Sequence, residues 1–182
     1  MMDLHLQEPP CQDIEGGCPA APPVNLNYPP EWEEFSRRIE IGERRSFVLR
    51  GAAHCGHAEV LILLHTVYGL TADDARADNN FALRIAAQRG HVEVLRVLHT
   101  VYGLTTDDAR AGNNAALRWA AMNGRIEVLI VLKTIYGLTA DDARADNNYA
   151  VKFATEYGHP EVLKVLRDIY SLTADDMQRL WG

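Results

Sequence analysis

The sequence predicts an all-α solenoid, a stack of short helix pairs, and two observations carry that prediction. Tyr-Gly-Leu-Thr begins at Tyr68, Tyr102 and Tyr136, and Tyr-Ser-Leu-Thr begins at Tyr170, each 34 residues after the last with no insertion or deletion. Between these copies, apolar residues recur at helical spacing. A fixed period of this length indicates supersecondary units that bury their apolar faces only against their neighbours.

One folded domain with an additional segment suits this chain of 182 residues, 47% of them hydrophobic. The net charge of −7 argues against nucleic acid and anionic membranes as partners, because both bind basic faces. No apolar run approaches the roughly 18 residues of a spanning helix, so we expect no membrane insertion, and the beginning of the chain lacks the features of a secretory signal. The three cysteines, Cys11, Cys18 and Cys55, form no disulfide framework. We therefore expect a cytoplasmic or other reducing compartment.

Residues 1–30 differ from the rest of the chain. They contain seven of the eight prolines and no lysine or arginine, so we expect an extended acidic arm that is disordered unless it is bound. Residues 31–44, with Trp32 and Phe35 among charges, predict a helix that caps the open end of the stack. At the other end, we expect the last unit to be covered by Met177, Leu180 and Trp181.

The unit at residues 78–111 illustrates the predicted helix pair. Residues 81–89 form a short apolar-periodic segment that Gly90 ends, and residues 91–102 form a second. Helical spacing alone assigns one set of second-helix residues to the core: Leu63, Leu95, Leu98, Val128, Leu129, Leu132, Val162 and Leu166.

Local signals predict what joins one pair to the next. Thr105 and Asp108 form a Thr-x-x-acid start signal, which indicates a brief helical turn. Asn113 and Asn114 then favour a left-handed turn into the next unit. Pro160 suits the first position of the fourth unit's second helix, because it lacks only a donor that would be unpaired there.

The helix pairs share one motif in register. It reads Leu49-Arg-Gly-Ala-Ala-His-Cys-Gly-His, Leu83-Arg-Ile-Ala-Ala-Gln-Arg-Gly-His, Leu117-Arg-Trp-Ala-Ala-Met-Asn-Gly-Arg and Val151-Lys-Phe-Ala-Thr-Glu-Tyr-Gly-His. This motif closely resembles the ankyrin repeat, whose core reads Leu-His-x-Ala-Ala-x-x-Gly-His, whereas the Trp-x-x-Leu-Gly pattern of tetratricopeptide repeats is absent. The resemblance covers residues 45–181 and implies an α-solenoid of ankyrin-like units. The implied units are 45–77, 78–111, 112–145, 146–170 and a terminal part-unit 171–182.

The sequence departs from that family at the finger, the segment that joins successive units. Gly-Leu-Thr-Ala-Asp-Asp-Ala-Arg-Ala replaces the usual hairpin sequence, so we expect a compact helical finger. A basic residue also replaces the family's histidine in every unit. We expect each to pair with an aspartate or a carbonyl of a neighbouring unit, because a buried cation must be paired. These residues are Arg50, Arg84, Arg118 and Lys152.

Two positions vary in every unit while the scaffold around them repeats. They directly follow the paired small residues, and the resemblance places them on the concave face, where the family makes its contacts. We therefore predict a partner-binding row of Gln88, Arg89, Met122, Asn123, Glu156 and Tyr157. The aromatic or apolar slot before the small residues, held by Ile85, Trp119 and Phe153, is predicted to be core.

Paired aspartates recur at the start of every finger. At a helix start, acids complement the unpaired N–H groups, and the arginines that follow (Arg76, Arg110 and Arg144) can compensate them within the finger. Their role is therefore structural first. A row of fingers also predicts an acidic ridge that would attract a basic partner surface. The predicted ridge consists of Asp73, Asp74, Asp107, Asp108, Asp141 and Asp142.

The cluster His54-Cys55-Gly56-His57 is the nearest approach to a chemical site. With Cys11 or Cys18 it could form a zinc site, or a thiol beside an imidazole. Its spacing matches no standard ligand pattern, and His57 is the ordinary histidine of the repeat. We therefore predict no catalytic residue, no metal and no cofactor.

The most strongly indicated function is non-catalytic protein–protein interaction through the concave face. One alternative is a structural subunit of a large assembly that is anchored by the arm, in which the chain would be a stable member of a larger complex. A metal- or thiol-dependent enzyme is a further alternative. The near-identical repeats also resemble the ankyrin sets of some intracellular bacteria, amoebae and giant viruses, which implies possible delivery to a host cell as an effector.

Overall fold

The computed structural model describes residues 45–178, and these residues form helices and no strands. The predicted arm, the predicted capping helix at 31–44, and Leu180 and Trp181 lie outside the described residues. The first helices of the successive pairs are α2 (Arg45–Cys55), α4 (Ala72–Arg89), α6 (Thr106–Met122) and α8 (Ala140–Glu156). The second helices are α3 (Ala58–Thr66), α5 (Val92–Thr100), α7 (Ile126–Thr134) and α9 (Pro160–Asp168), and the short α10 (Ala174–Gln178) follows.

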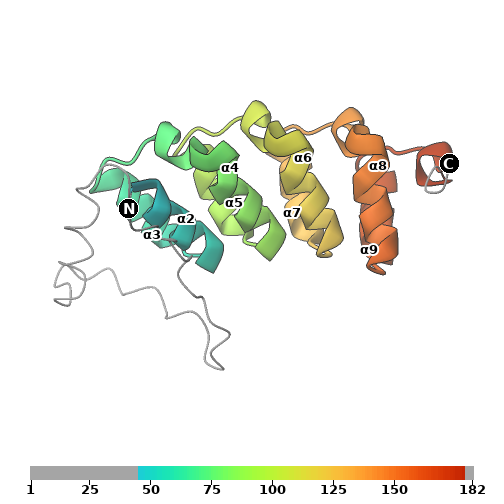
Figure 1. Cartoon of the computed structure of the whole chain (residues 1–182), viewed down its shortest axis with the longest axis horizontal. Coiled ribbons are helices and arrows are strands. Elements are labelled where there is room, and N and C mark those ends of the chain that lie inside the picture. The colour runs from blue at the N-terminus through green and yellow to red at the C-terminus, as the bar shows by residue number, and fades with distance from the viewer. Residues whose placement is uncertain (1–44, 179–182) are drawn as a thin grey trace, which may run out of the picture.

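The helix pairs stand side by side along the long axis of the molecule, with the fingers gathered at one edge (Figure 1). Each first helix contacts the first helices of the neighbouring units as well as its own second helix, and the second helices pack on one another in the same way. This two-layer stack confirms the predicted all-α solenoid.

Each finger is helical. Thr71 begins α4 with a capping box, in which the Thr71 N–H donates to Asp74 Oδ2 at 2.8 Å. The same box starts α6 at Thr105 and α8 at Thr139. The helical finger predicted from the Thr-x-x-acid signal is confirmed, because this signal satisfies the free N–H groups of a helix start.

A left-handed turn separates each finger from the rest of its first helix. In α4, Ala77 is extended, and Asp78, Asn79 and Asn80 then follow at φ of 53°, 58° and 58°. The same conformation recurs in the next unit at Asn113 and Asn114, as predicted. Asparagine and aspartate tolerate this region better than other residues with a Cβ, because their short polar side chains can bond locally.

The ends of the helix pairs also lie where the sequence predicts them. Gly90 follows α4 in the left-handed conformation, and Pro160 is the first residue of α9. Tyr102, Tyr136 and Tyr170, which mark the repeat in the sequence, lie just after the second helices and are buried.

The core runs without interruption through the stack. The predicted core residues Leu95, Leu98, Val128, Leu129, Leu132, Val162 and Leu166 are buried. Leu63 is only half-buried, so the prediction is wrong for it. Its equivalents in the inner units, Val97 and Val131, are buried, but α3 is the first second helix among the described residues and has a described second-helix neighbour on one side only.

Tyrosine hydroxyls join each unit to the one before it. Tyr102 Oη donates to the Leu61 carbonyl at 2.8 Å, and the same bond, at the same length, joins Tyr136 to Leu95 and Tyr170 to Leu129. Burial raises the pKa of all three phenols, so they stay protonated and remain donors. This ladder fixes the register between neighbouring second helices.

A second ladder links the start of each second helix to the end of the preceding first helix. His91 Nε2 lies 2.9 Å from the His54 carbonyl oxygen, and His159 Nε2 lies 2.9 Å from that of Met122. In the unit between them, Arg125 replaces the histidine, and its Nε donates to the Gln88 carbonyl at 3.2 Å. The histidine of the repeat therefore acts as a structural donor.

Candidate partner-binding face

The predicted partner-binding row lies at the C-terminal ends of the first helices. Gln88 and Arg89 end α4, Met122 ends α6 and is followed by Asn123, and Glu156 ends α8 and is followed by Tyr157. The backbone of the row is held by the second ladder, because the carbonyls of Gln88 and Met122 accept its bonds. Successive members of the row therefore lie at fixed positions along the stack.

The side chains of the row differ in their solvent exposure and in the hydrogen bonds that they already form. The Asn123 amide donates to the Trp119 carbonyl at 2.8 Å and so ends α6. Arg89 is exposed and places Nη2 2.9 Å from His54 Nε2 in the preceding unit. Tyr157 is 55% exposed, which is high for a large aromatic side chain. Arg89, Glu156 and Tyr157 are thus the most accessible members of the row.

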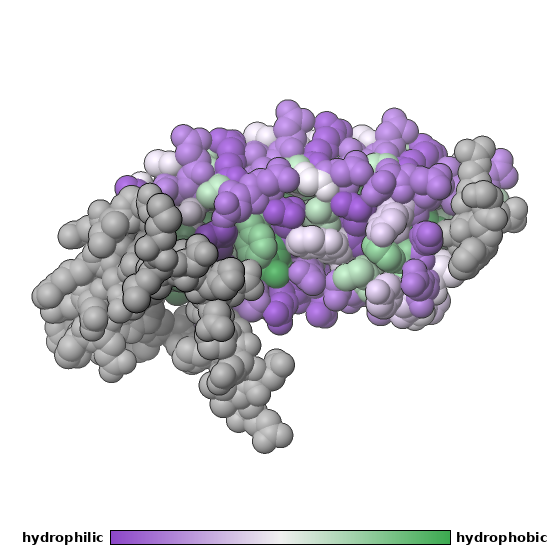
Figure 2. All heavy atoms as spheres, in the orientation of Figure 1, coloured by the Kyte–Doolittle hydropathy of each residue, from purple (hydrophilic) through white to green (hydrophobic). Residues whose placement is uncertain are grey.

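Trp119 and Phe153 are only half-buried and lie outside the core cluster, so their assignment to the core is wrong, whereas Ile85 is buried at 7% exposure. Phe153 stacks edge-on with two aromatic neighbours, Tyr149 on α8 at 4.0 Å and Tyr157 just after it at 5.8 Å between ring centroids. The row therefore continues along the first helix as an aromatic strip. Figure 2 shows apolar side chains reaching the surface in patches between polar ones along the stack.

Arginines lie over several of these rings. The Arg84 guanidinium is 5.7 Å from the Phe81 ring centroid and 5.2 Å from that of Trp119. Arg118 is 5.2 Å from the Tyr149 ring. We call the set defined by these contacts the aromatic–arginine face: Phe81, Arg84, Arg118, Trp119, Tyr149, Phe153 and Tyr157. The signal that could have found part of it is the spacing of four residues between Tyr149, Phe153 and Tyr157.

The predicted pairing of the basic residues with neighbouring units holds for two of the four. Arg50 forms an ion pair with Asp78, and Arg118 Nη1 lies 2.8 Å from Asp146 Oδ2. Arg84 donates instead to the carbonyl of Asp78 in its own unit at 2.9 Å. Lys152 is exposed and forms no ion pair within the described part of the chain.

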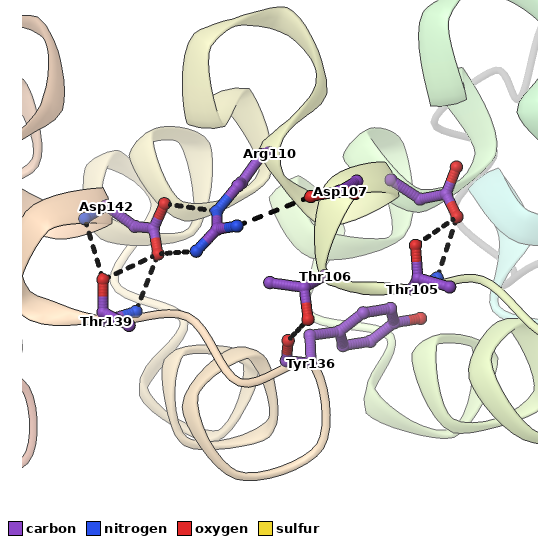
Figure 3. Close-up of polar contacts among 8 residues, drawn as sticks. Thr105, Thr106, Asp107, Arg110, Tyr136, Thr139 and Asp142 are labelled. Atoms are coloured by element: carbon purple, nitrogen blue, oxygen red, sulfur yellow. Dashed lines mark hydrogen bonds and ion pairs between the residues drawn. The ribbon is translucent and has the colours of Figure 1, made fainter.

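The two acids of each finger have different environments. Asp107 is 91% exposed at its side chain, whereas Asp142, the second acid of the next finger, is 8% exposed. Figure 3 shows how Arg110 joins them. Its Nε and Nη2 donate to Asp142 at 2.7 Å and 3.1 Å, and Nη1 reaches back to Asp107 at 3.4 Å. Each arginine thus forms an ion pair with an aspartate of the next finger as well as with one of its own finger.

The arrangement repeats along the edge of the stack. Arg76 binds Asp108 in the same bidentate way, and Arg144 binds Asp176. Burial raises the pKa of Asp108 and Asp142, but the arginine and the capping threonine outweigh it and lower both pKa values overall. The acids that face solvent as a ridge are therefore Asp73, Asp107 and Asp141, whereas Asp74, Asp108 and Asp142 cap helices.

The His54–His57 cluster shows no metal site. Cys55 Sγ lies 4.0 Å from His54 Nδ1. Among residues 45–178, no group of three or more histidine, cysteine, aspartate or glutamate side chains could hold a metal ion. Cys11 and Cys18 lie outside the described residues.

None of the helices in the described part of the chain is long and apolar enough to span a membrane.

Helix pairs in register, left-handed turns and recurring inter-unit hydrogen bonds define a helical repeat protein with a variable row of side chains. A family model for ankyrin repeats (three copies) matches residues 49–140, and the chain belongs to the ankyrin-repeat family. Ankyrin repeats are a protein–protein interaction module. No match to a curated protein was found.

A solved structure is similar in fold. It is a chain of the crystal structure of the yeast ribosomal protein Rps3 in complex with its chaperone Yar1. The TM-score is 0.60 at 20% sequence identity, and the match covers 73% of this chain and 97% of that chain. The similarity shows that the two chains share a fold over 73% of this chain.

Proposed function

We propose that this protein binds a partner protein through the row at the ends of its first helices and the adjoining aromatic–arginine face. The observation that carries the proposal is the aromatic strip of half-buried Tyr149 and Phe153 on α8, which continues directly into the row at the exposed Tyr157. Aromatic and arginine side chains are the types that contribute most to protein interfaces.

Pre-organisation supports the same proposal. The tyrosine ladder and the histidine ladder hold neighbouring units in register, so the row loses little conformational freedom when a partner binds. The variable side chains are therefore presented on a backbone whose arrangement repeats from unit to unit. We expect Arg89, Met122 and Tyr157 to determine which partner binds, because each differs chemically from the residues at the equivalent positions of the other units.

The fingers supply a second, weaker element. Asp73, Asp107 and Asp141 project into solvent at one edge of the stack and would attract a basic region of the partner. Exposed charges of this kind mainly raise the rate of association and lose their effect as salt is added. The ridge would therefore steer the partner and contribute little to the lifetime of the complex.

Affinity capture from native extract with quantitative mass spectrometry tests the proposal. The full chain is compared with the triple variant Arg89→Ala, Met122→Ala and Tyr157→Ala. The matched control replaces three exposed residues of the second helices, Glu59, Glu127 and Lys164, by alanine. We expect a stoichiometric partner that the triple variant loses and the control keeps, because truncating several anchors weakens binding by about tenfold or more.

A variant lacking residues 1–30 separates the proposal from the alternative of an arm-anchored assembly subunit. If the partner is kept without the arm, the face carries binding. If the partner is lost without the arm and kept by the triple variant, the assembly alternative is correct and the face proposal is wrong.

A further inference from the structure

Two of the four basic residues of the first helices form an ion pair with an aspartate of the next unit, and Arg84 does not. Arg50 forms an ion pair with Asp78 of the next unit, and Arg118 forms one with Asp146 of the next unit. Arg84 lies between them, and the equivalent position in the unit that follows it is Gly112. The carboxylate that completes the other two pairs is therefore missing opposite Arg84.

The arginine is nevertheless held in place. Its guanidinium lies against two rings, 5.7 Å from Phe81 and 5.2 Å from Trp119, and Nη2 donates to the Asp78 carbonyl at 2.9 Å. Its Nε is buried and has no hydrogen-bond partner, as is also true of Arg118, so the two arginines differ in the carboxylate. Burial without a carboxylate lowers the pKa of Arg84. Arg84 is thus an oriented guanidinium whose counter-ion is absent among residues 45–178.

Two further arginines lie at the C-terminal end of α4, although the chain carries a net charge of −7. Arg89 near the end of the same helix bonds with a histidine, and Arg125 bonds with a backbone carbonyl. Neither these two residues nor Arg84 forms an ion pair with an acid within the described stack. This part of the face is therefore complementary to an acidic segment.

We propose that Arg84 is the recognition site for a carboxylate of the partner protein, which takes the place that Asp78 and Asp146 take on Arg50 and Arg118. The inference rests on the proposed function and names the chemistry of the partner: an aspartate or glutamate flanked by apolar residues that contact Trp119. Arginine suits this role because its guanidinium forms a charge-assisted hydrogen bond with a carboxylate, as Arg118 Nη1 does with Asp146 at 2.8 Å, and its plane stacks on aromatic rings.

The chain itself supplies a sharp test, the substitution Gly112→Asp. A Cβ at Gly112 would lie 3.4 Å from Ala115 Cβ, 3.4 Å from Asn79 Nδ2 and 3.6 Å from Arg84 Cδ, so there is room for a side chain that begins beside Arg84. The backbone suits it as well, because Gly112 has φ of 64° while Asp78 and Asp146 have φ of 53° and 56°. Gly112→Asn is the matched control, since it has nearly the same shape and conformational preference without the charge.

The binding probe is a short glutamate-rich peptide containing leucine, with a glutamine-for-glutamate copy as its control. Binding is followed by nuclear magnetic resonance on the full chain, using the Trp119 indole N–H signal, which Trp119→Phe assigns. We expect the glutamate peptide to shift that signal and to bind wild type and Gly112→Asn about tenfold more tightly than Gly112→Asp and Arg84→Gln. The glutamine peptide should leave the signal unchanged.

Several results would overturn the inference. They are no shift of the Trp119 signal, equal binding by Gly112→Asp and Gly112→Asn, or binding that Arg84→Gln leaves unaltered. If Gly112→Asp in the free full chain shifts the signals of residues 1–30, the chain's own acidic arm occupies Arg84, and the partner is not its ligand.

Affinity capture of the partner with the Gly112 variants distinguishes this inference from the proposed function. If the triple row variant loses the partner and Gly112→Asp keeps it, the row binds and the Arg84 inference is wrong. If both lose it while Gly112→Asn keeps it, both proposals are supported. If neither loses it, both are wrong.

Discussion

Arg110 binds Asp142 of the next unit through two hydrogen bonds, from Nε at 2.7 Å and from Nη2 at 3.1 Å. The same carboxylate accepts the N–H of Thr139 at 2.8 Å and so caps α8. One buried acid therefore does two things: it starts a helix and joins two units. Because the contact recurs at Asp108 and Asp176, it couples the folding of each finger to that of the finger before it.

Asp142→Ala should destabilise the stack more than Asp141→Ala, although the two residues are adjacent. The first change removes the capping box of α8, for which we expect a loss of about 0.5–2 kcal/mol, together with the bond to Arg110. The second removes an acid that is 92% exposed, and surface pairs of this kind contribute little. Urea unfolding followed by circular dichroism measures both, and equal losses would contradict the structural role of Asp142.

The capping aspartates make stability depend on pH. Because the pKa values of Asp108 and Asp142 are lower in the folded chain than in the unfolded chain, the folded state binds fewer protons in the acid range. Their contribution is therefore complete above about pH 4, the unfolded pKa, and is lost as the pH falls through the folded values. Thermal unfolding between neutral pH and pH 3 should show this loss. It should be smaller in Asp108→Asn/Asp142→Asn, and an unchanged slope would show that other groups control it.

Local signals in the sequence predicted the scaffold well. The Thr-x-x-Asp start of each finger, the Asn-Asn turn and Pro160 all depend on residues within a few positions of one another, so their geometry follows from backbone preferences. The direction of Arg110 does not follow in this way. It lies three residues after Asp107 and 32 residues before Asp142, and only the stacking of units brings the second acid within reach.

The exposure of particular side chains was harder to predict, because it depends on what the neighbouring unit contributes. Trp119 occupies the same slot as the buried Ile85, yet it is only half-buried beneath the Arg84 guanidinium. The tyrosine ladder carried no sequence signal beyond the repeat itself, since its acceptors are backbone carbonyls such as that of Leu95. Whether the predicted row binds a partner stays a prediction.

Tyr136→Phe isolates the hydrogen bond of the tyrosine ladder. The change removes only the hydroxyl that donates to the Leu95 carbonyl at 2.8 Å, and it leaves the buried ring in place. We expect a loss of about 1 kcal/mol in the free energy of unfolding, the usual value for one such bond. Tyr157→Phe is the control, because its ring is 55% exposed, and it should be nearly neutral. A neutral Tyr136→Phe would show that the ring alone holds the two units.

Two glycines that follow helices separate backbone strain from steric fit between units. Gly56 and Gly69 both have positive φ, 81° and 63°, where a residue with a Cβ costs about 1–2 kcal/mol. A Cβ at Gly69 would meet nothing within 4 Å, whereas a Cβ at Gly56 would lie 2.7 Å from His91 Nδ1. Gly56→Ala must therefore also displace the imidazole that reaches the His54 carbonyl. Chemical denaturation should show a larger loss for Gly56→Ala than for Gly69→Ala. Equal losses would mean that the His91 bond contributes nothing to the stability of the stack.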